Sequence, residues 1–366
     1  MFEKYPFEKL NELLAGIKPE TEKRYILTIG EPKFDTPEFI KKALCENTAY
    51  LNKYPKTAGE EVLKEAIRGF IKRRYGVEVD EKEVLPTFGT REVLFNFPLF
   101  LRAKKMAFPN PFYHIYEGAA IAAGSKIKYL LLTKENDFKN TIFQLDGDEN
   151  FIILNTPNNP TASVMSIDEL CEWAEYALKK DIVILSDECY SELYFEKKPP
   201  SILEASKKIG NNGFKNILAI NSISKRSSAP GLRSGYIAGD KEILQKYLQF
   251  RTYVGCAVPI PLQLAAAKAW SEDSHVEEFR KKYKENFEIA KEILQIKIPE
   301  ATFYIWLETD NDIEFAKKAW RKGVRVMPGS FMGREGAGKN YVRLALVYDK
   351  QATKEALKII KELMPR

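Results

Sequence analysis

Short apolar runs alternate with amphipathic segments along most of the chain. Four of these runs have the length of a buried strand and end at polar residues: 151–155, 182–186, 217–221 and 236–238. Such runs, separated by helical patterns, are typical of a mostly parallel sheet that helices cover on both faces. Ligands of open α/β sheets bind just beyond the carboxyl ends of the strands. The polar residues at these ends are therefore the first candidates for a functional site.

Two segments have the periodicity of amphipathic helices. In residues 60–75 the apolar side chains share one face, and Gly76 follows as a stop signal. A longer periodic span covers residues 271–297, where Ser274 and Glu277 have the spacing of a capping box. We expect this long helix to lead into a second domain.

The last part of the chain predicts a small α+β domain. Strand-like runs lie near residues 303–308 and 341–347, and a helical pattern starts at residue 351. A length of 366 residues suits one large domain and one smaller one. We predict a large domain from residues 46–285, and a small domain from residues 1–45 and 286–366.

Composition and charge exclude few functions. The chain carries 57 Lys+Arg and 51 Asp+Glu, a net charge of +6, and the two signs are interspersed. This gives weak support for a nucleic-acid partner and fits a multiply anionic substrate equally well. With only two histidines, the chain offers no multi-histidine metal site and few options for a Ser-His-Asp triad. We expect no metal and no nucleic-acid partner.

The sequence carries no targeting or membrane signal. Residues 1–10 lack the continuous apolar core of a signal peptide, and no stretch approaches the roughly 18–20 apolar residues of a membrane helix. The four cysteines form no CxxC pair, which suits buried thiols in a reducing compartment. We expect a cytoplasmic protein without a membrane partner.

Lys225 has an unusual sequence context. Ser222 lies three residues before it, and Arg233 follows eight residues after it, between Gly231 and Gly235. This arrangement suits a lysine that forms a Schiff base beside a bound phosphate. A single lysine among 57 basic residues is, however, more often a solvated side chain. The Schiff-base interpretation therefore depends on agreement from other motifs.

A Schiff-base cofactor such as pyridoxal phosphate needs several further groups. Its pyridine nitrogen needs a carboxylate, its phosphate needs backbone amides, hydroxyls and an arginine, and its ring needs a flat partner. Each group has a candidate at a strand end or in a loop: Asp187 and Tyr190, Gly89-Thr90-Arg91 at a helix start, the aromatic segment 111–116, the polar loop 155–161, and Arg343.

Taken singly, each candidate also has a purely structural explanation. Asp187 could cap a helix, and the loop 155–161 could be only a turn. Tyr113 and Tyr116 could belong to the core, and Arg343 could lie on the solvent face of an edge strand. The joint order of these motifs along the chain is what favours the functional interpretation.

That order resembles the class I/II pyridoxal-phosphate aminotransferases of fold type I, over roughly residues 27–348. The motifs that carry the resemblance are Gly89-Thr90-Arg91, Pro111-Phe112-Tyr113, Asn159-Pro160, Asp187-x-x-Tyr190, Ser222-x-x-Lys225 and Arg233. The resemblance implies an α/β fold with a large doubly wound, mostly parallel sheet of the seven-stranded type and a smaller α+β domain. It also implies pyridoxal 5'-phosphate as the cofactor, and amino and keto acids as substrates.

The resemblance implies a role for each residue around the cofactor ring. Lys225 would form the Schiff base and then move the substrate proton. Asp187 would pair with the ring nitrogen, and Tyr190 and Asn159 would bond the ring hydroxyl oxygen. Tyr113 would stack on the ring, where other members carry Trp or Phe. Ala162 replaces a glycine that often ends the loop of Asn159 in the family, which slightly alters that turn.

Further roles concern the phosphate and the substrate. Gly89, Thr90, Arg91, Ser222 and Arg233 would hold the phosphate, with Thr90 and Arg91 acting through their backbone. Arg343 would clamp the α-carboxylate of the substrate beside Asn159, and Gly30 would let the substrate approach the backbone. Tyr54 would reach the phosphate of a partner subunit, which implies a homodimer.

Several segments resemble one subfamily, the bacterial N-succinyldiaminopimelate aminotransferases: residues 30–33, 54–59, 109–113 running to 116–120, 186–195, 224–227 with 230–235, and 251–253 with 255–257. This implies glutamate as amino donor and N-succinyl-2-amino-6-oxopimelate as acceptor. The product would be N-succinyl-LL-2,6-diaminopimelate, in lysine and diaminopimelate biosynthesis. The additional carboxylates of this substrate need further donors, for which we select Arg226, Arg251 and Tyr253.

Other interpretations stay open. An aminotransferase of broader specificity (aspartate, alanine or aromatic) or a carbon–sulfur lyase would use the same cofactor-binding residues. The segment 333–340 resembles a phosphate-binding P-loop, but it lacks the Ser/Thr after Lys339, and a strand-like run follows where a helix is required. We expect this segment to be a mobile loop over the site, with Phe331 lining the pocket.

Overall fold

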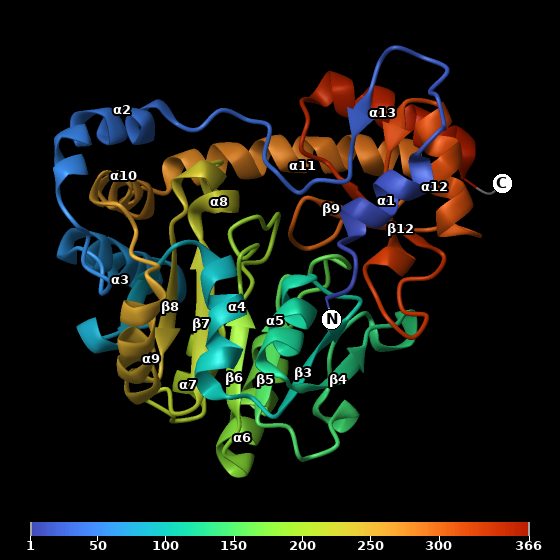
Figure 1. The fold of residues 1–366 in the computed structure, drawn as a ribbon. Helices are drawn as coiled ribbons and strands as arrows, with labels where there is room; N and C mark the ends of the chain where they lie inside the picture. Colours follow the sequence, from blue (N-terminus) through green and yellow to red (C-terminus); the bar gives the residue numbers. More distant parts are fainter. Residues whose placement is uncertain (1, 365–366) are drawn as a thin grey trace.

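The computed structural model describes residues 2–364. Its main element is a seven-stranded sheet with the strand order β2-β8-β7-β6-β5-β3-β4 (Figure 1). The strands are β2 (Val84–Thr87), β3 (Lys105–Asn110), β4 (Lys126–Leu131), β5 (Phe151–Asn155), β6 (Val183–Asp187), β7 (Ile217–Ser222) and β8 (Gly235–Gly239). Only β8 runs antiparallel to its neighbours. The predicted mostly parallel sheet is therefore confirmed, and the four expected strands are β5 to β8.

Helices cover both faces of this sheet. One face is covered by α3 (Glu61–Tyr75), α6 (Ile167–Lys180), α7 (Ile202–Lys208) and α10 (Ile260–Ser271), and the other by α4 (Thr90–Leu101), α5 (Ile115–Ala123) and α9 (Lys241–Val254). Alternate residues of β5 pack on opposite faces: Phe151 and Ile153 contact the second layer, while Ile152 and Leu154 contact the first. Burial on both faces explains why this strand is a continuous apolar run.

The predicted helix starts and stops are only partly right. Helix α3 ends at Gly76, whose φ of 66° is a left-handed conformation that favours glycine. The long helix α11 (Ser274–Leu294) does not begin with the predicted capping box. Ser274 is already the first helical residue, so its hydroxyl is not at the capping position. The carboxylate of Glu272 accepts the Ser274 amide instead, at 2.5 Å.

A second, smaller sheet has the order β11-β12-β9, and a separate pair joins β1 to β10. These strands are β1 (Tyr25–Ile26), β9 (Tyr304–Glu308), β10 (Val324–Arg325), β11 (Met327–Pro328) and β12 (Tyr341–Ala345). They pack with α11, α12 (Asp312–Arg321) and α13 (Lys350–Leu363) around a core of their own. In Figure 1, α11 extends from the side of α2 (Glu38–Glu46) and α10 to this second core.

The predicted domain boundaries stay a prediction, and both fall inside helices. The boundary at residues 285 and 286 interrupts α11, and the boundary at residues 45 and 46 lies at the end of α2. Ile40 and Ala43 of α2 pack in the core of the seven-stranded sheet, so this helix packs with the large sheet.

Among the described residues, no helix is long and apolar enough to span a bilayer.

Glu188 is a fully buried carboxyl directly after β6. Its Oε1 accepts hydrogen bonds from Ser201 Oγ (3.1 Å) and from the Ile202 amide (2.9 Å) at the start of α7. Burial raises the pKa of Glu188 from 4.5 to about 8. The folded protein therefore keeps this carboxyl protonated at a pH where the unfolded chain ionises it. Its contribution to the free energy of unfolding is fully present below about pH 4.5 and is lost as the pH rises to about 8.

Replacing Glu188 by glutamine should flatten the pH dependence of stability. Glutamine keeps the shape of the protonated acid but does not titrate. Between about pH 5 and about pH 8, the midpoint of thermal unfolding should fall less in Glu188→Gln than in the unmodified protein, and the variant should be the more stable one at the upper end. Melting curves across this range test the prediction, and parallel pH profiles of the two proteins would contradict it.

Candidate active site

A cavity of about 700 Å³ lies at the carboxyl ends of β5, β6 and β7. Asn155, Asp187 and Ser222, the last residues of these strands, all line it. Tyr304 of β9 and Arg343 of β12 line it from the smaller sheet. The sequence-predicted residues that share this cavity are Gly30, Thr90, Arg91, Tyr113, Asn159, Asp187, Tyr190, Ser222, Lys225, Arg233 and Arg343.

Lys225 lies on the short helix α8 (Ile223–Arg226), which starts directly after β7. The side-chain oxygen of Ser222 caps this helix by accepting the Ser224 amide at 3.1 Å. The Lys225 amine donates to the carbonyl oxygen of Gly30. Burial lowers the pKa of Lys225 to about 8, so near neutral pH far more of the amine is uncharged than in an ordinary lysine. An amine of this kind is a nucleophile.

Asp187 is a buried carboxylate at the end of β6. Its Oδ2 accepts from the hydroxyl of Tyr116 at 2.8 Å, and its Oδ1 accepts from the Cys189 amide at 3.3 Å. Burial raises the pKa of Asp187. Among residues 2–364 no cationic side chain lies within ion-pair distance of it. A buried acid of this kind is stabilised by a cation that a ligand brings.

Arg343 extends from β12 into the cavity. Its Nη1 donates to Asn159 Oδ1 and its Nη2 to the Thr28 carbonyl, both at 2.6 Å. The guanidinium lies 4.3 Å from the centre of the Tyr304 ring. Its Nε is buried without a hydrogen-bond partner among the described residues. A carboxylate placed in the cavity would supply the missing acceptor and charge.

Gly30 leaves room for a tyrosine pair. A Cβ atom on Gly30 would lie 1.8 Å from the Tyr304 hydroxyl oxygen, far inside van der Waals contact. That hydroxyl is 2.9 Å from the hydroxyl of Tyr190. Any other residue at position 30 would displace Tyr304 and, with it, the partner of Tyr190.

An anion-binding corner lies at the start of α4. Thr90 and Arg91 form the first turn of this helix, whose free amides favour negative charge. Gly89 precedes them with a φ of 72°, and a Cβ there would lie 2.3 Å from Arg233 Nη2. Arg233 donates to the Pro230 carbonyl at 2.9 Å but has no carboxylate partner among the described residues.

The three residues selected for distal carboxylates do not line the cavity, and that prediction is wrong for direct contacts within one chain. Arg251 is buried against Glu92, with its Nε 2.9 Å from Oε1. Arg226, the last residue of α8, is buried and donates to Asp273 Oδ1 at 2.6 Å. Both guanidinium groups are already neutralised by carboxylates. Tyr253 is 87% exposed on α9, outside the cavity.

Two other predictions concern residues around the cavity. Tyr54 is fully exposed and lies outside the cavity of its own chain, so its role across a subunit interface stays a prediction. Met332 lines the cavity in place of Phe331, which packs against the cluster of Leu10 and Leu14.

Sequence reasoning gave no specific role to several residues of the cavity. Tyr116 stands three residues after Tyr113, but only the structure brings its hydroxyl to Asp187. Asn155 ends β5, and its Oδ1 accepts the Asn159 amide at 2.8 Å. Tyr304 is a β9 residue that no motif marks. Tyr5 lines the cavity beside α1 (Pro6–Leu14), far from the other motifs in sequence.

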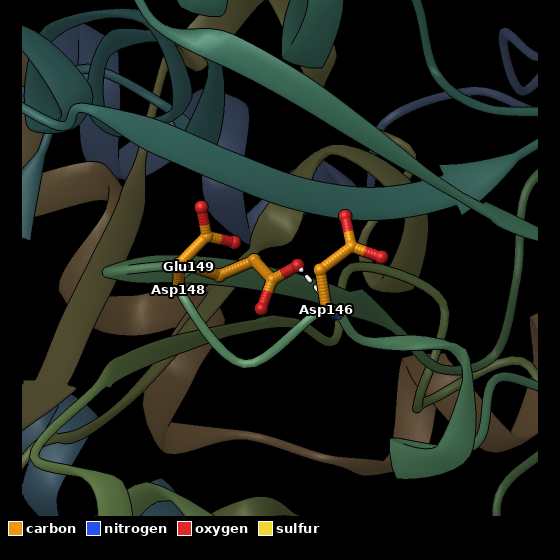
Figure 2. A group of neighbouring side chains, drawn as sticks. All are labelled: Asp146, Asp148 and Glu149. Atoms are coloured by element: carbon orange, nitrogen blue, oxygen red, sulfur yellow. Dashed lines mark hydrogen bonds between the residues drawn. The ribbon is translucent and has the colours of Figure 1, made fainter.

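A group of acidic residues lies at the amino ends of the strands, opposite the cavity and just before β5. Figure 2 shows Asp146, Asp148 and Glu149 around one loop. Lys105 pairs with all three, at 2.7 Å from Asp146 and 3.5 Å from Glu149. Glu149 also accepts the Asp146 amide at 2.9 Å. Charge balance within the chain accounts for this group.

The cavity residues fit a phosphorylated pyridine aldehyde. The amine of Lys225 with its lowered pKa suits an aldehyde, and the buried Asp187 suits a protonated ring nitrogen. The α4 start suits a phosphate, and so does the guanidinium of Arg233, which has no carboxylate partner among the described residues. These are the groups that pyridoxal 5'-phosphate requires.

Comparison with known proteins gives the same class. The sequence pattern of the family "Aminotransferase class I and II" matches residues 23–360. The aminotransferase AspB of Helicobacter pylori superimposes with a TM-score of 0.96 at 46% identity, covering 99% of this chain and 98% of that one.

Two curated relatives have more specific names. A 4-dedimethylamino-4-oxo-anhydrotetracycline transaminase of Streptomyces rimosus is 32% identical over 87% of this chain and 88% of its own length. An LL-diaminopimelate aminotransferase of Maridesulfovibrio salexigens is 30% identical over 98% of this chain and 96% of its own length.

The chain belongs to the class I and II aminotransferases. It is an enzyme that uses pyridoxal 5'-phosphate to transfer amino groups between amino and keto acids. The fold expected from the resemblance is thereby confirmed.

The pKa of Lys225 predicts how fast the cofactor-free protein captures its cofactor. Only the neutral amine attacks an aldehyde, so the rate constant for capture of pyridoxal 5'-phosphate should rise with pH and level off above about 8. Stopped-flow absorbance at saturating cofactor measures this rate constant. A rate that keeps rising towards the pKa of an ordinary lysine, about 10.4, would contradict the assigned environment of Lys225.

Proposed function

We propose that this aminotransferase moves an amino group from glutamate to N-succinyl-2-amino-6-oxopimelate, forming N-succinyl-LL-2,6-diaminopimelate. The observation that carries the proposal is an excess of cations in the cavity. Lys225, Arg91, Arg233 and Arg343 line it, and none has a carboxylate partner within the described residues. The cofactor aldehyde needs Lys225, its phosphate needs one arginine, and one substrate carboxylate needs another. One arginine of the cavity therefore has no anion assigned to it.

The residues nearest the reacting carbon have separate roles. Bound pyridoxal 5'-phosphate supplies an aldehyde that takes up the amino group and a ring that withdraws electrons from the carbon losing its proton. Lys225 Nζ would hold the cofactor and would be the base that moves this proton. Asp187 provides negative charge at the ring nitrogen, and Tyr116 and the Cys189 amide keep its carboxylate oriented.

Other residues bind and orient. Tyr190 and Asn159 would hold the cofactor through its ring hydroxyl oxygen, and Tyr113 would support the ring. Gly89, Thr90, Arg91, Ser222 and Arg233 form the phosphate pocket, with Arg91 contributing its backbone. Arg343, fixed by Asn159 and Thr28, receives the α-carboxylate in a bidentate fork. Gly30 keeps the backbone close to the substrate.

The side chain of Arg91 is the cation to which these roles assign no anionic partner. Its Nη2 lies 3.0 Å from the Tyr113 hydroxyl oxygen and its Nε 3.3 Å from the same atom, so Tyr113 holds the guanidinium in place. Arg91 is exposed to the cavity. We assign it to a second carboxylate, such as the γ-carboxylate of glutamate. This assignment replaces Arg226, Arg251 and Tyr253.

The assembly and the compartment are part of the proposal. Tyr54 is fully exposed, and near it in sequence Leu51 is 72% exposed. Large exposed apolar side chains of this kind suit a subunit interface. We propose a cytoplasmic homodimer in which Tyr54 reaches the phosphate of the partner subunit. The named LL-diaminopimelate aminotransferase relative supports the substrate class.

Absorbance spectra of the cofactor-loaded enzyme test the substrate assignment. Glutamate and then N-succinyl-LL-2,6-diaminopimelate should each convert the lysine-bound cofactor to its aminated form. If the succinylated compound does not convert the cofactor better than aspartate or aromatic amino acids do, the result would favour an aminotransferase of broader specificity. Release of pyruvate and ammonia from cystathionine would favour a carbon–sulfur lyase.

Substituting Arg91 by glutamine should affect dicarboxylates selectively. Glutamate and norvaline have the same carbon chain and differ only in the distal carboxylate. Loss of one charge-assisted contact is worth about 1.5–3 kcal/mol, so KM for glutamate should rise about 10- to 100-fold. KM for norvaline should stay within about threefold of its value in the unmodified enzyme.

Half-reaction kinetics with the two amino acids measure this contrast. Equal losses for glutamate and norvaline would place Arg91 at the cofactor instead, and unchanged values for both would remove it from substrate binding.

A further inference from the structure

Arg226 follows Lys225 directly in sequence, yet its side chain points away from the cavity and is fully buried. Its Nη1 donates to the Ala269 carbonyl oxygen and its Nη2 to Asp273 Oδ1, both at 2.6 Å. The guanidinium carbon lies 4.8 Å from the ring centre of Phe70 and 5.2 Å from that of Trp270. The end of α8 is therefore fixed to the corner between α10 and α11.

The next residue makes a second attachment to the same corner. Ser227 is buried, and its Oγ lies 2.8 Å from Nε2 of His275 in the first turn of α11. The other ring nitrogen of His275 contacts the carboxylate of Glu272. Ser227 is closed off from the cavity, so this serine, histidine and glutamate form a structural link and have no access to substrate.

A third contact faces the loop that follows Asp187. Glu192 is buried, and its Oε2 lies 4.0 Å from Arg226 Nε. Arg74 of α3 holds the other side of this loop, with its Nε 2.5 Å from Glu192 Oε1 and its Nη2 3.1 Å from the Ser191 carbonyl oxygen. Arg226 thus connects the end of α8 to the residues that follow Tyr190.

Neutralisation of these acids does not explain Arg226. Glu192 keeps its ion pair with Arg74, and Asp273 keeps one with Arg73, whose Nε is 3.0 Å from Asp273 Oδ2. Burying an additional guanidinium costs free energy unless its hydrogen bonds and ion pairs offset the loss of water. The geometry that only this arginine provides is the connection of α8 to both neighbours.

We propose that Arg226 is a positioning residue for Lys225, which holds the four-residue helix α8 against the start of α11 and against the loop after Asp187. Because Lys225 is the adjacent residue, a shift of Arg226 moves the amine relative to the cavity. The inference rests on the proposed role of Lys225 as the residue that binds the cofactor and moves the proton.

Three variants of the cofactor-loaded enzyme test the proposal: Arg226→Met, Arg226→Lys and the matched control Arg73→Met. Methionine keeps the buried volume without a charge, and neither acid is left unpaired because Arg73 and Arg74 remain. Lysine keeps the charge but loses the planar fork. Arg73 binds the same Asp273 and, among the described residues, makes no hydrogen bond or ion pair to α8. The measurements are kcat and KM for glutamate, the thermal midpoint, and the pH midpoint of the lysine–cofactor absorbance.

In Arg226→Met, kcat should fall about 10- to 100-fold, as expected when a reacting group moves by about an ångström. KM should stay within about threefold, and the pH midpoint of the absorbance should shift. Arg226→Lys should recover part of kcat. Arg73→Met should lose thermal stability without a change in kcat or in the pH midpoint.

Unchanged kcat and pH midpoint in Arg226→Met would overturn the proposal, as would equal losses of kcat in Arg226→Met and Arg73→Met. If Arg226→Met does not fold, Arg226→Lys decides the question by the same two readouts against Arg73→Met. If the unmodified enzyme does not react with glutamate, the proposed function fails, and the absorbance midpoint still tests Arg226 independently.

Discussion

Burial of charge without an opposite partner is the constraint on which the site depends. Asp187 is a buried acid with no cation beside it, and the buried Arg343 and the half-buried Lys225 have no carboxylate partner among the described residues. Such groups cost free energy until a ligand of complementary charge enters. A cationic ring nitrogen, a phosphate and a substrate carboxylate provide that complement, which links the fold to the family's cofactor and to amino and keto acids.

The scaffold makes this burial possible by fixing each group from elsewhere in the chain. Parallel strands end at one edge of the sheet, so Asn155, Asp187 and Ser222 meet there although they are far apart in sequence. The small sheet brings Arg343 from the opposite side, and Gly30 leaves space for Tyr304 beneath it. Neither the large sheet nor the small sheet carries all of the site residues. The arrangement suits a reaction in which a substrate is held between the large and the small sheet.

Local patterns predicted the parts of the fold whose cause is local. The apolar runs of β5 to β7 reflect burial on both faces, and Gly76 marks the end of α3 because it adopts a left-handed conformation. Eleven predicted residues share one cavity, because strand ends and helix starts converge on one sheet edge. Arg226 and Arg251 were misplaced because their partners, Asp273 and Glu92, are distant in sequence and no pattern links them. Tyr304 reaches the site only through packing of the small sheet.

We propose that Lys225 is the lysine that binds the cofactor covalently. Reduction of the cofactor-loaded enzyme with borohydride, followed by digestion and peptide mass spectrometry, identifies the modified residue directly. We expect a single modified lysine at position 225, and no modification when Lys225 is replaced by alanine. Labelling of a different lysine, or equal labelling of the Lys225→Ala variant, would contradict the site described here.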